Sequence, residues 1–168
     1  MEQAYPAEGF FDLTALDLFQ LACQQYEQFY HAQTPINAYL VSVTLFHLLD
    51  WLVKDGSSER GRKAIEEKEA TERSVEEELV LTIYGLDEFR AVISAANNAK
   101  HHELDNKKRP AYAKKRRQGA FAGVTRAGDS LGTEFLILDV DGKEVWLRDA
   151  FGKVLDQYRT HFTPTKSR

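Results

Sequence analysis

Residues 36–54 constrain the fold more than any other segment, because apolar side chains surround most of a helical circumference there. Thr34 is a preferred N-cap residue, Pro35 suits the first helical position, and Gly56 marks the end. A helix that is apolar on nearly all sides is normally buried. The sequence therefore predicts a central bundle helix carrying Tyr39, Leu40, Val43, Leu45, Phe46, Leu48, Leu49, Trp51 and Leu52.

Three further helices are expected before residue 102. Apolar residues recur every three or four positions over residues 11–31 and again over residues 86–101, which is the spacing of one helix face. Residues 55–73 between them are charged and offer few apolar anchors. We expect a loop at the start of this region, continuing into a surface helix that ends at Gly85. That helix gains a core face only late, through Val75, Leu79, Val80, Ile83 and Tyr84.

The pattern changes after residue 105. Residues 106–118 are rich in Lys and Arg and contain Pro110, so a regular helix throughout is not expected. Short β-type runs follow, and Asp141-Gly142 between two of them is a strong hairpin signal, because both central residues of a type I′ turn need positive φ. The β-type runs cover residues 120–125, 133–140 and 143–148.

The last segments complete the expected architecture. An aromatic-rich helix is predicted over residues 149–162. The fold class is α+β and mainly α: a four-helix bundle, then a small antiparallel sheet, then a C-terminal helix. We expect one domain over residues 1–168, with the bundle at about 10–102, the basic segment at 106–118, and the hairpin with its helix at 119–162. The alternation of a half-buried sheet is seen at Phe135, Ile137, Val145 and Leu147.

Charge and cysteine content narrow the class of protein. The net charge is −4, so the chain as a whole is no polycation, although eight Lys or Arg residues fall between Lys100 and Arg117. The single cysteine, Cys23, excludes an intramolecular disulfide and fits a reducing compartment. No signal-peptide pattern and no apolar run of about 18 residues is present. We expect a cytoplasmic protein with no membrane partner.

Two polar stripes lie on the apolar helices. The first, within residues 36–54, consists of His47, Asp50 and Lys54. The second, within residues 86–101, consists of Arg90, Ser94, Asn97 and His101. The two stripes can face each other across a small polar cleft, or each can be the solvated edge of its helix. A hydrogen-bonded His47–Asp50 pair inside the bundle is a third interpretation.

The helix end at Lys100 and His101 places a cation beside a group that titrates near neutral pH. Lys100 either extends into solvent from the helix end, where a cation is favoured, or neutralises a negative ligand. A metal site would need His47, Asp50, His101 and His102, but adjacent histidines diverge by about 100° on a helix. No metal and no cofactor are expected.

The basic segment is the main candidate for nucleic-acid binding. Tyr112 lies in its middle and Phe121 follows it. Cations can track a phosphate backbone while aromatic rings stack on bases. The other interpretation is a solvated loop whose positive charge balances the acidic residues of the surface helix that ends at Gly85. The cations are Lys107, Lys108, Arg109, Lys114, Lys115, Arg116 and Arg117.

The helix with His47-x-x-Asp50-Trp51 and the helix end with Asn97-x-x-Lys100-His101 together resemble a family of uncharacterised small bacterial proteins. The strand, Asp-Gly turn, strand and aromatic-rich helix of the tail are similar too. More distantly, a helical bundle with a polar histidine at the end of its last helix resembles the HEPN superfamily. That resemblance implies a bacterial or phage origin and, for many members, metal-independent ribonuclease activity in toxin–antitoxin or phage-defence systems.

The HEPN resemblance implies His101 as general acid/base, Lys100 (or Arg90 from a second copy) as the cation on the phosphate, and Asn97 as the group that orients it. It also implies RNA as ligand, a homodimer and an antitoxin-like partner protein. The arginine that the family places shortly before its histidine is missing from residues 93–96, and Arg90 lies about 16 Å upstream along a helix. We therefore expect a degenerate, non-catalytic nucleic-acid-binding or interaction module. The alternative is a metal-independent ribonuclease that uses His101.

Overall fold

The computed structural model describes residues 13–100, 114–130 and 132–163, and of residues 98–100 and 114–115 it describes the backbone alone. These residues form six α-helices, a short 3₁₀ helix and a three-stranded antiparallel sheet. The expected fold class, α+β and mainly α, is confirmed. The elements are α1 (Ala15–His31), α2 (Pro35–Leu52), α3 (Glu59–Glu66), η1 (Ala70–Glu72), α4 (Val75–Tyr84), α5 (Asp87–Lys100), β1 (Lys114–Gln118), β2 (Glu134–Val140), β3 (Lys143–Trp146) and α6 (Leu147–Phe162).

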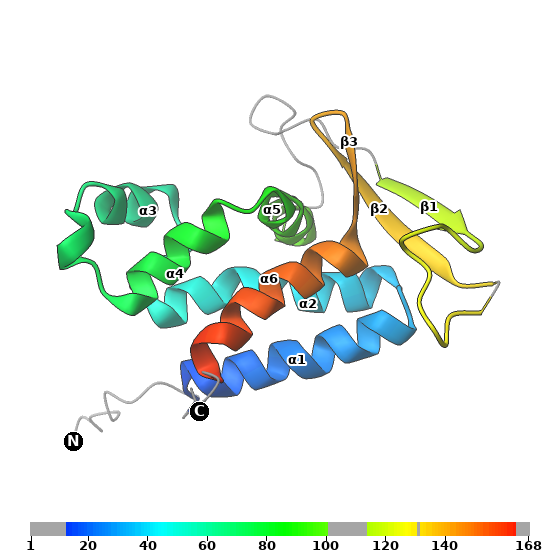
Figure 1. Ribbon diagram of the computed structural model, residues 1–168, viewed down its shortest axis with the longest axis horizontal. Helices are drawn as coiled ribbons and strands as arrows, with labels where there is room; N and C mark the ends of the chain where they lie inside the picture. Colours follow the sequence, from blue (N-terminus) through cyan, green and yellow to red (C-terminus); the bar gives the residue numbers. More distant parts are fainter. Residues whose placement is uncertain (1–12, 101–113, 131, 164–168) are drawn as a thin grey trace, which may run out of the picture.

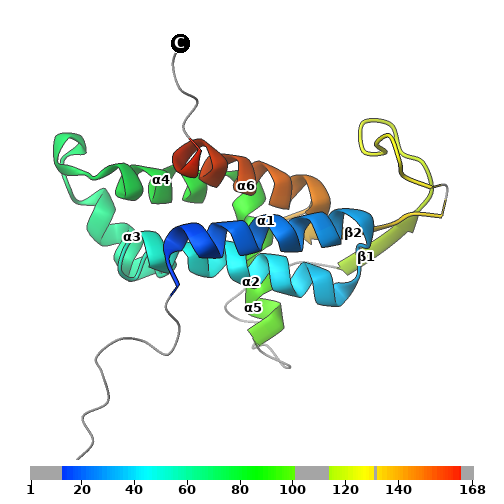
Figure 2. The same ribbon diagram turned by 90° about the horizontal axis from the view of Figure 1, so that it is seen from below.

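Helices α1, α2, α5 and α6 pack around the main core, and α2 contacts the other three. Helices α1 and α2 run side by side, and α5 crosses them (Figure 1, Figure 2). The expected start of α2 is confirmed, because the Thr34 side-chain oxygen accepts a 3.2 Å hydrogen bond from the Asn37 amide. The buried Tyr158 hydroxyl donates to the Leu45 carbonyl at 2.8 Å and so ties α6 to α2. The C-terminal helix is thus part of the bundle.

One side of α2 is exposed, so this helix is central without being buried all round. Ile36 is 71% exposed, Tyr39 45% and Trp51 43%. At about 100° per residue these positions fall on the same side of the helix as His47 and Asp50. The opposite side carries the fully buried residues of the core, including Val41, Leu45, Leu48 and Leu49.

The expected single surface helix before Gly85 is wrong, because the structure divides it into α3, η1 and α4. Ser74 begins α4 with a complete capping box, which ends the preceding segment. The Arg73 side chain holds the connection by donating to the carbonyls of Ile65, Glu66 and Lys68. Gly56 is required where α2 ends, because a Cβ there would lie 2.3 Å from the Leu49 carbonyl oxygen.

The sheet has the order β1-β2-β3. The hairpin at Asp141-Gly142 is confirmed, with φ angles of 52° and 80° that suit a type I′ turn. The prediction of a strand at residues 120–125 is wrong, because that segment forms turns. The strand that pairs with β2 on its other edge is β1, which lies within the basic segment. Lys and Arg have little intrinsic preference for strands, but the edge of β2 supplies backbone partners for β1.

Strand β2 is buried on both faces, in contrast to the half-buried sheet expected from its alternation. Leu136, Leu138 and Val140 join the bundle core. Phe135 and Ile137 are equally buried on the other face. Residues 119–130 fold back over that face, and Phe121 contacts Phe135 with ring centroids 5.8 Å apart. Leu147, placed in a strand by its alternation, begins α6 instead.

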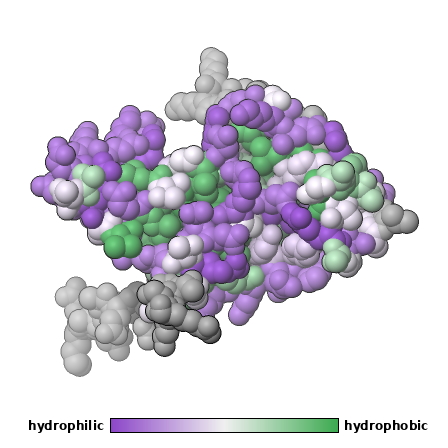
Figure 3. Space-filling view, in the orientation of Figure 1, coloured by the Kyte–Doolittle hydropathy of each residue, from purple (hydrophilic) through white to green (hydrophobic). Residues whose placement is uncertain are grey.

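The two ends of the molecule differ in surface character. The α3 end is almost wholly hydrophilic on the face drawn in Figure 3, whereas hydrophobic surface shows over α4 and in smaller areas over the sheet end. Within the described ranges, no helix combines the length and the apolar composition needed to cross a membrane.

Candidate nucleic-acid interface

One residue of the second polar stripe, Arg90, contacts the hairpin. Arg90, half-exposed on α5, forms an ion pair with Asp141. Ser94 is buried and Asn97 is exposed. Lys100 ends the helix, and its side chain is outside the described part of the structure. His101 also lies outside the described residues, as do Lys107, Lys108 and Arg109.

In the first polar stripe, Asp50 contacts the connection that follows α2. The Asp50 carboxylate accepts hydrogen bonds from the Ser57 amide at 2.9 Å and from its hydroxyl at 2.6 Å. His47 Nδ1 lies 3.4 Å from Asp50 Oδ2, with the His47 side chain 51% exposed. This pair is therefore at the surface, where it fixes the chain after α2. The described contacts of Asp50 and Arg90 go to different elements, so they do not join the two stripes into one cleft.

The edge strand β1 presents the described cations of the basic segment. Arg116 and Arg117 have side chains 58% and 42% exposed. Arg116 lies 3.5 Å from a Glu134 carboxylate oxygen, and Arg117 donates to Glu144 at 2.7 Å. Lys114 and Lys115 belong to the same strand, and only their backbone is described. Successive β1 residues alternate between the two faces, so the two arginines lie on opposite faces of the sheet.

Arg117 shares its face of the sheet with an aromatic cluster of Phe121, Phe135 and Trp146. The ring centroid of Trp146 lies 5.2 Å from that of Phe121 and 5.5 Å from that of Phe135. The guanidinium carbon of Arg117 lies 5.9 Å from the Trp146 centroid, within the range of a cation–π contact. Phe135 is fully buried, whereas Phe121 and Trp146 are half-buried. Residues distant in sequence thus place a cation beside the half-buried Trp146 ring, which in turn contacts the half-buried Phe121 ring.

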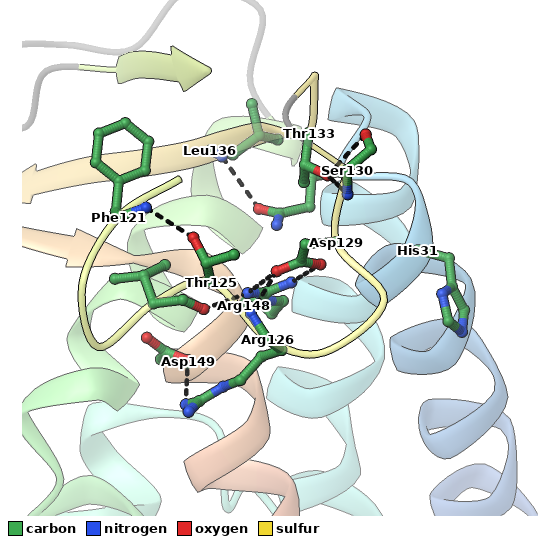
Figure 4. A network of polar contacts seen from close by, with 12 residues as sticks. His31, Phe121, Thr125, Arg126, Asp129, Ser130, Thr133, Leu136, Arg148 and Asp149 are labelled. Carbon is green, nitrogen blue, oxygen red and sulfur yellow. Dashed lines mark hydrogen bonds and ion pairs between the residues drawn. The ribbon is translucent and has the colours of Figure 1, made fainter. Parts of the chain in front are cut away.

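The segment that supplies Phe121 is folded by its own hydrogen bonds (Figure 4). The Thr125 hydroxyl accepts from the Phe121 amide at 2.7 Å, and Asp129 Oδ2 accepts from the Arg126 amide at 2.7 Å. The Thr133 hydroxyl oxygen accepts from the Ser130 amide at 3.0 Å. In each bond a side-chain oxygen accepts from a backbone amide three or four residues earlier, so these bonds close successive turns between Phe121 and Thr133.

A buried arginine anchors this segment to the bundle. Arg148, on the first turn of α6, is 1% exposed and binds both oxygens of Asp129, at 2.9 and 3.0 Å. It also donates to the Val124 carbonyl at 2.5 Å. Its guanidinium carbon lies 4.7 Å from the Tyr30 ring centroid and 5.0 Å from that of Phe135. From helix α6, the Arg148 guanidinium therefore contacts helix α1, the sheet and the segment that contains Val124 and Asp129 (Figure 4).

The electrostatics of this anchor follow from burial and pairing. The hydrogen bonds from Arg148 hold the pKa of the Asp129 carboxyl below its usual value. Burial disfavours the charged guanidinium, but the hydrogen bonds and charge of Asp129 outweigh it and raise the pKa of Arg148. Both groups remain ionised over the whole physiological range.

Sequence reasoning missed Asp129, Trp146 and Arg148. The sequence does contain a signal for Trp146, because this large aromatic residue lies between Val145 and Leu147 and so falls on the opposite face of the predicted strand. Arg148 has none, since an arginine at a strand–helix junction is ordinarily exposed. Its burial depends on a carboxylate 19 residues earlier in the chain.

Other features of the described surface contribute no site. Among the side chains that the structure describes, no group of three or more His, Cys, Asp or Glu residues could hold a metal ion. An open hollow lies on α3, far from the sheet (Figure 1), and contains none of the predicted site residues. Comparison with protein-family models, with curated proteins and with solved structures finds no match to this chain.

Proposed function

We propose that this protein is a non-catalytic, HEPN-like helical-bundle module that binds RNA through its basic segment, residues 106–118. The observation that carries this proposal is the position of Arg116 and Arg117 on an exposed edge strand, with Phe121 and Trp146 on the face of Arg117. Cations that contact phosphates and rings that contact bases are the two components of a nucleic-acid interface.

The ion pairs of β1 are compatible with RNA binding. Exposed pairs such as Arg117–Glu144 contribute about 0.2–1 kcal/mol, so phosphates can compete for the guanidinium. An arginine also has five N–H donors, and Glu144 accepts one described bond from Arg117. The carboxylates hold the arginines in place and lower the affinity for RNA without abolishing it.

The sequence before His101 favours the non-catalytic form, because residues 93–96 contain no arginine. The nearest upstream arginine, Arg90, is paired with Asp141 on the hairpin, and a phosphate beside His101 of a second copy would have to compete for it. The alternative is a metal-independent ribonuclease of the toxin–antitoxin or phage-defence type, in which His101, Lys100 and Asn97 act on the phosphate. Cleavage of total RNA in EDTA that is lost in His101→Ala would establish this alternative.

We further propose that the protein acts in the cytoplasm as a homodimer, with an antitoxin-like protein as an additional partner. The exposed side of α2 supports the homodimer, because Ile36 and Tyr39 place apolar surface in solvent at its N-terminal end. Such surface is buried favourably against a second copy.

Fluorescence anisotropy with labelled RNA at several salt concentrations tests RNA binding. Arg116→Gln and Arg117→Gln should each weaken binding and lower the salt dependence by about 0.7 in the slope of log K against log salt. Arg159→Gln is the matched control, because Arg159 is a half-exposed, ion-paired arginine on the last turns of α6, far from the sheet. RNA binding that all three variants retain unchanged would refute the proposal.

A further inference from the structure

We infer that the interface accepts single-stranded rather than double-stranded nucleic acid, with Trp146 and Phe121 as the surface on which an unpaired base stacks. This inference rests on the proposed RNA-binding function and specifies the form of the ligand. It uses only described residues: the two half-buried rings and Arg117 beside them.

The chemistry of the aromatic and cationic groups favours a single strand. Arginines alone would contact the phosphates of a duplex and of a single strand alike. A partly exposed tryptophan adds affinity only where a base exposes its face, which paired and stacked bases inside a helix do not. The Trp146 ring, with the Arg117 guanidinium carbon 5.9 Å from its centroid, therefore distinguishes single strands from duplexes.

The two rings are held in position before a base binds. Trp146 pairs with Ile137 in the β-ladder, and its ring is tilted by 55° to that of Phe121 and by 73° to that of Phe135. Phe121 belongs to the segment that the ion pair of Asp129 and Arg148 holds on the bundle. The side chains of Asp129 and Arg148 are 6% and 1% exposed. A rigid stacking surface loses little conformational entropy when a base binds.

Arg117 lies directly beside the stacking surface. It contacts both the Trp146 ring and the Glu144 carboxylate. A phosphate can exchange with the carboxylate while the guanidinium stays beside the ring. Base stacking and phosphate neutralisation then take place on one nucleotide, which neither group achieves alone.

Anisotropy titrations with a labelled single-stranded RNA of about 12 nucleotides and with the duplex of the same sequence test this inference. We expect wild type to prefer the single strand. Trp146→Leu keeps an apolar side chain but removes the π-face, so its single-strand affinity should fall roughly 5- to 150-fold while duplex affinity stays within twofold. Trp146→Phe should retain most of the single-strand affinity. Equal affinity of wild type for both RNAs, or an unchanged single-strand affinity of Trp146→Leu, would overturn the inference.

A second measurement does not depend on the folding of a Trp146 variant. The chain has two tryptophans, so Trp51→Phe leaves Trp146 as the only one. Saturating single-stranded RNA should quench its fluorescence, and duplex should not. Unchanged fluorescence at saturation would overturn the inference even if binding occurs. If neither RNA binds at low salt, the proposed function itself fails, whereas duplex binding that is lost in Arg117→Gln would preserve that function and reject only the single-strand preference.

Discussion

The buried pair of Asp129 and Arg148 should hold residues 119–133 on the bundle, and Asp129→Asn tests this directly. The substitution keeps the side-chain shape but leaves the buried guanidinium without a counter-charge. Removing one partner of a buried ion pair lowers the free energy of unfolding by about 3–5 kcal/mol. Arg148 keeps its bond to Val124 and its contacts with Tyr30 and Phe135, so we expect a loss of about 3 kcal/mol, at the lower end of this range.

Urea denaturation followed by circular dichroism measures this loss. With an m-value of about 2 kcal/mol per molar urea, a loss of about 3 kcal/mol lowers the midpoint by about 1.5 M. Asp156→Asn is the matched control, because Asp156 is paired with Arg159 on the exposed side of α6. An exposed pair contributes at most about 1 kcal/mol, or about 0.5 M.

Local opening of residues 119–133 would appear differently from global unfolding. If Asp129→Asn releases this segment while the bundle stays folded, the midpoint changes little and limited proteolysis within residues 119–133 becomes faster. Adding Arg148→Met removes the unpaired charge, so the double variant should lose less than the sum of the two single losses. A midpoint within 0.5 M of wild type, together with unchanged proteolysis, would show that the ion pair does not hold the segment.

Further predictions concern binding, pH and assembly. Glu144→Gln should strengthen RNA binding and Arg117→Gln should weaken it, in anisotropy titrations at low salt, because the carboxylate competes with phosphates. The stability that Asp129 contributes should be complete above its ordinary pKa of 3.8 and be lost as the pH falls through its lowered pKa. The difference in unfolding free energy between wild type and Asp129→Asn should therefore be constant from pH 7 to about 5 and shrink below pH 4. Ile36→Glu should convert a dimer to a monomer in light scattering. Val75→Glu is the control, because Val75 on α4 is 70% exposed and Ile36 is 71% exposed, and it should leave the dimer intact. A dimer that survives Ile36→Glu would exclude the exposed side of α2 as the dimer interface.

The helices and the hairpin could be predicted because their signals are local. The Thr34-Pro35 start of α2 depends on one capping bond and one fixed φ angle, and the Asp141-Gly142 turn depends on two positive φ angles. Each of these preferences is determined by neighbouring residues, so it can be read without knowledge of the tertiary structure.

The strands and the buried anchor could not be predicted because their causes are distant in sequence. Strand β1 consists of cationic residues and one glutamine, and it becomes a strand by pairing with β2, whose residues follow it by 16 or more positions. The apolar residues Phe121 and Val124 resemble a strand in sequence, but they form turns over Phe135 because Arg148 donates a hydrogen bond to the Val124 carbonyl. Tertiary contacts override strand preference in both cases.

The same tertiary contacts connect stability with binding. Arg148 fixes residues 119–133 through Asp129, and this segment places Phe121 against Trp146. A change at Asp129 therefore alters both the free energy of unfolding and the position of a stacking ring, whereas a change at the exposed Arg117 alters binding and changes the free energy of unfolding by at most about 1 kcal/mol. Because the two residues lie on different elements and act through different contacts, their effects on stability can be separated. An effect of Asp129→Asn on single-strand affinity, in protein that is still folded, would then reflect the loss of a preorganised surface.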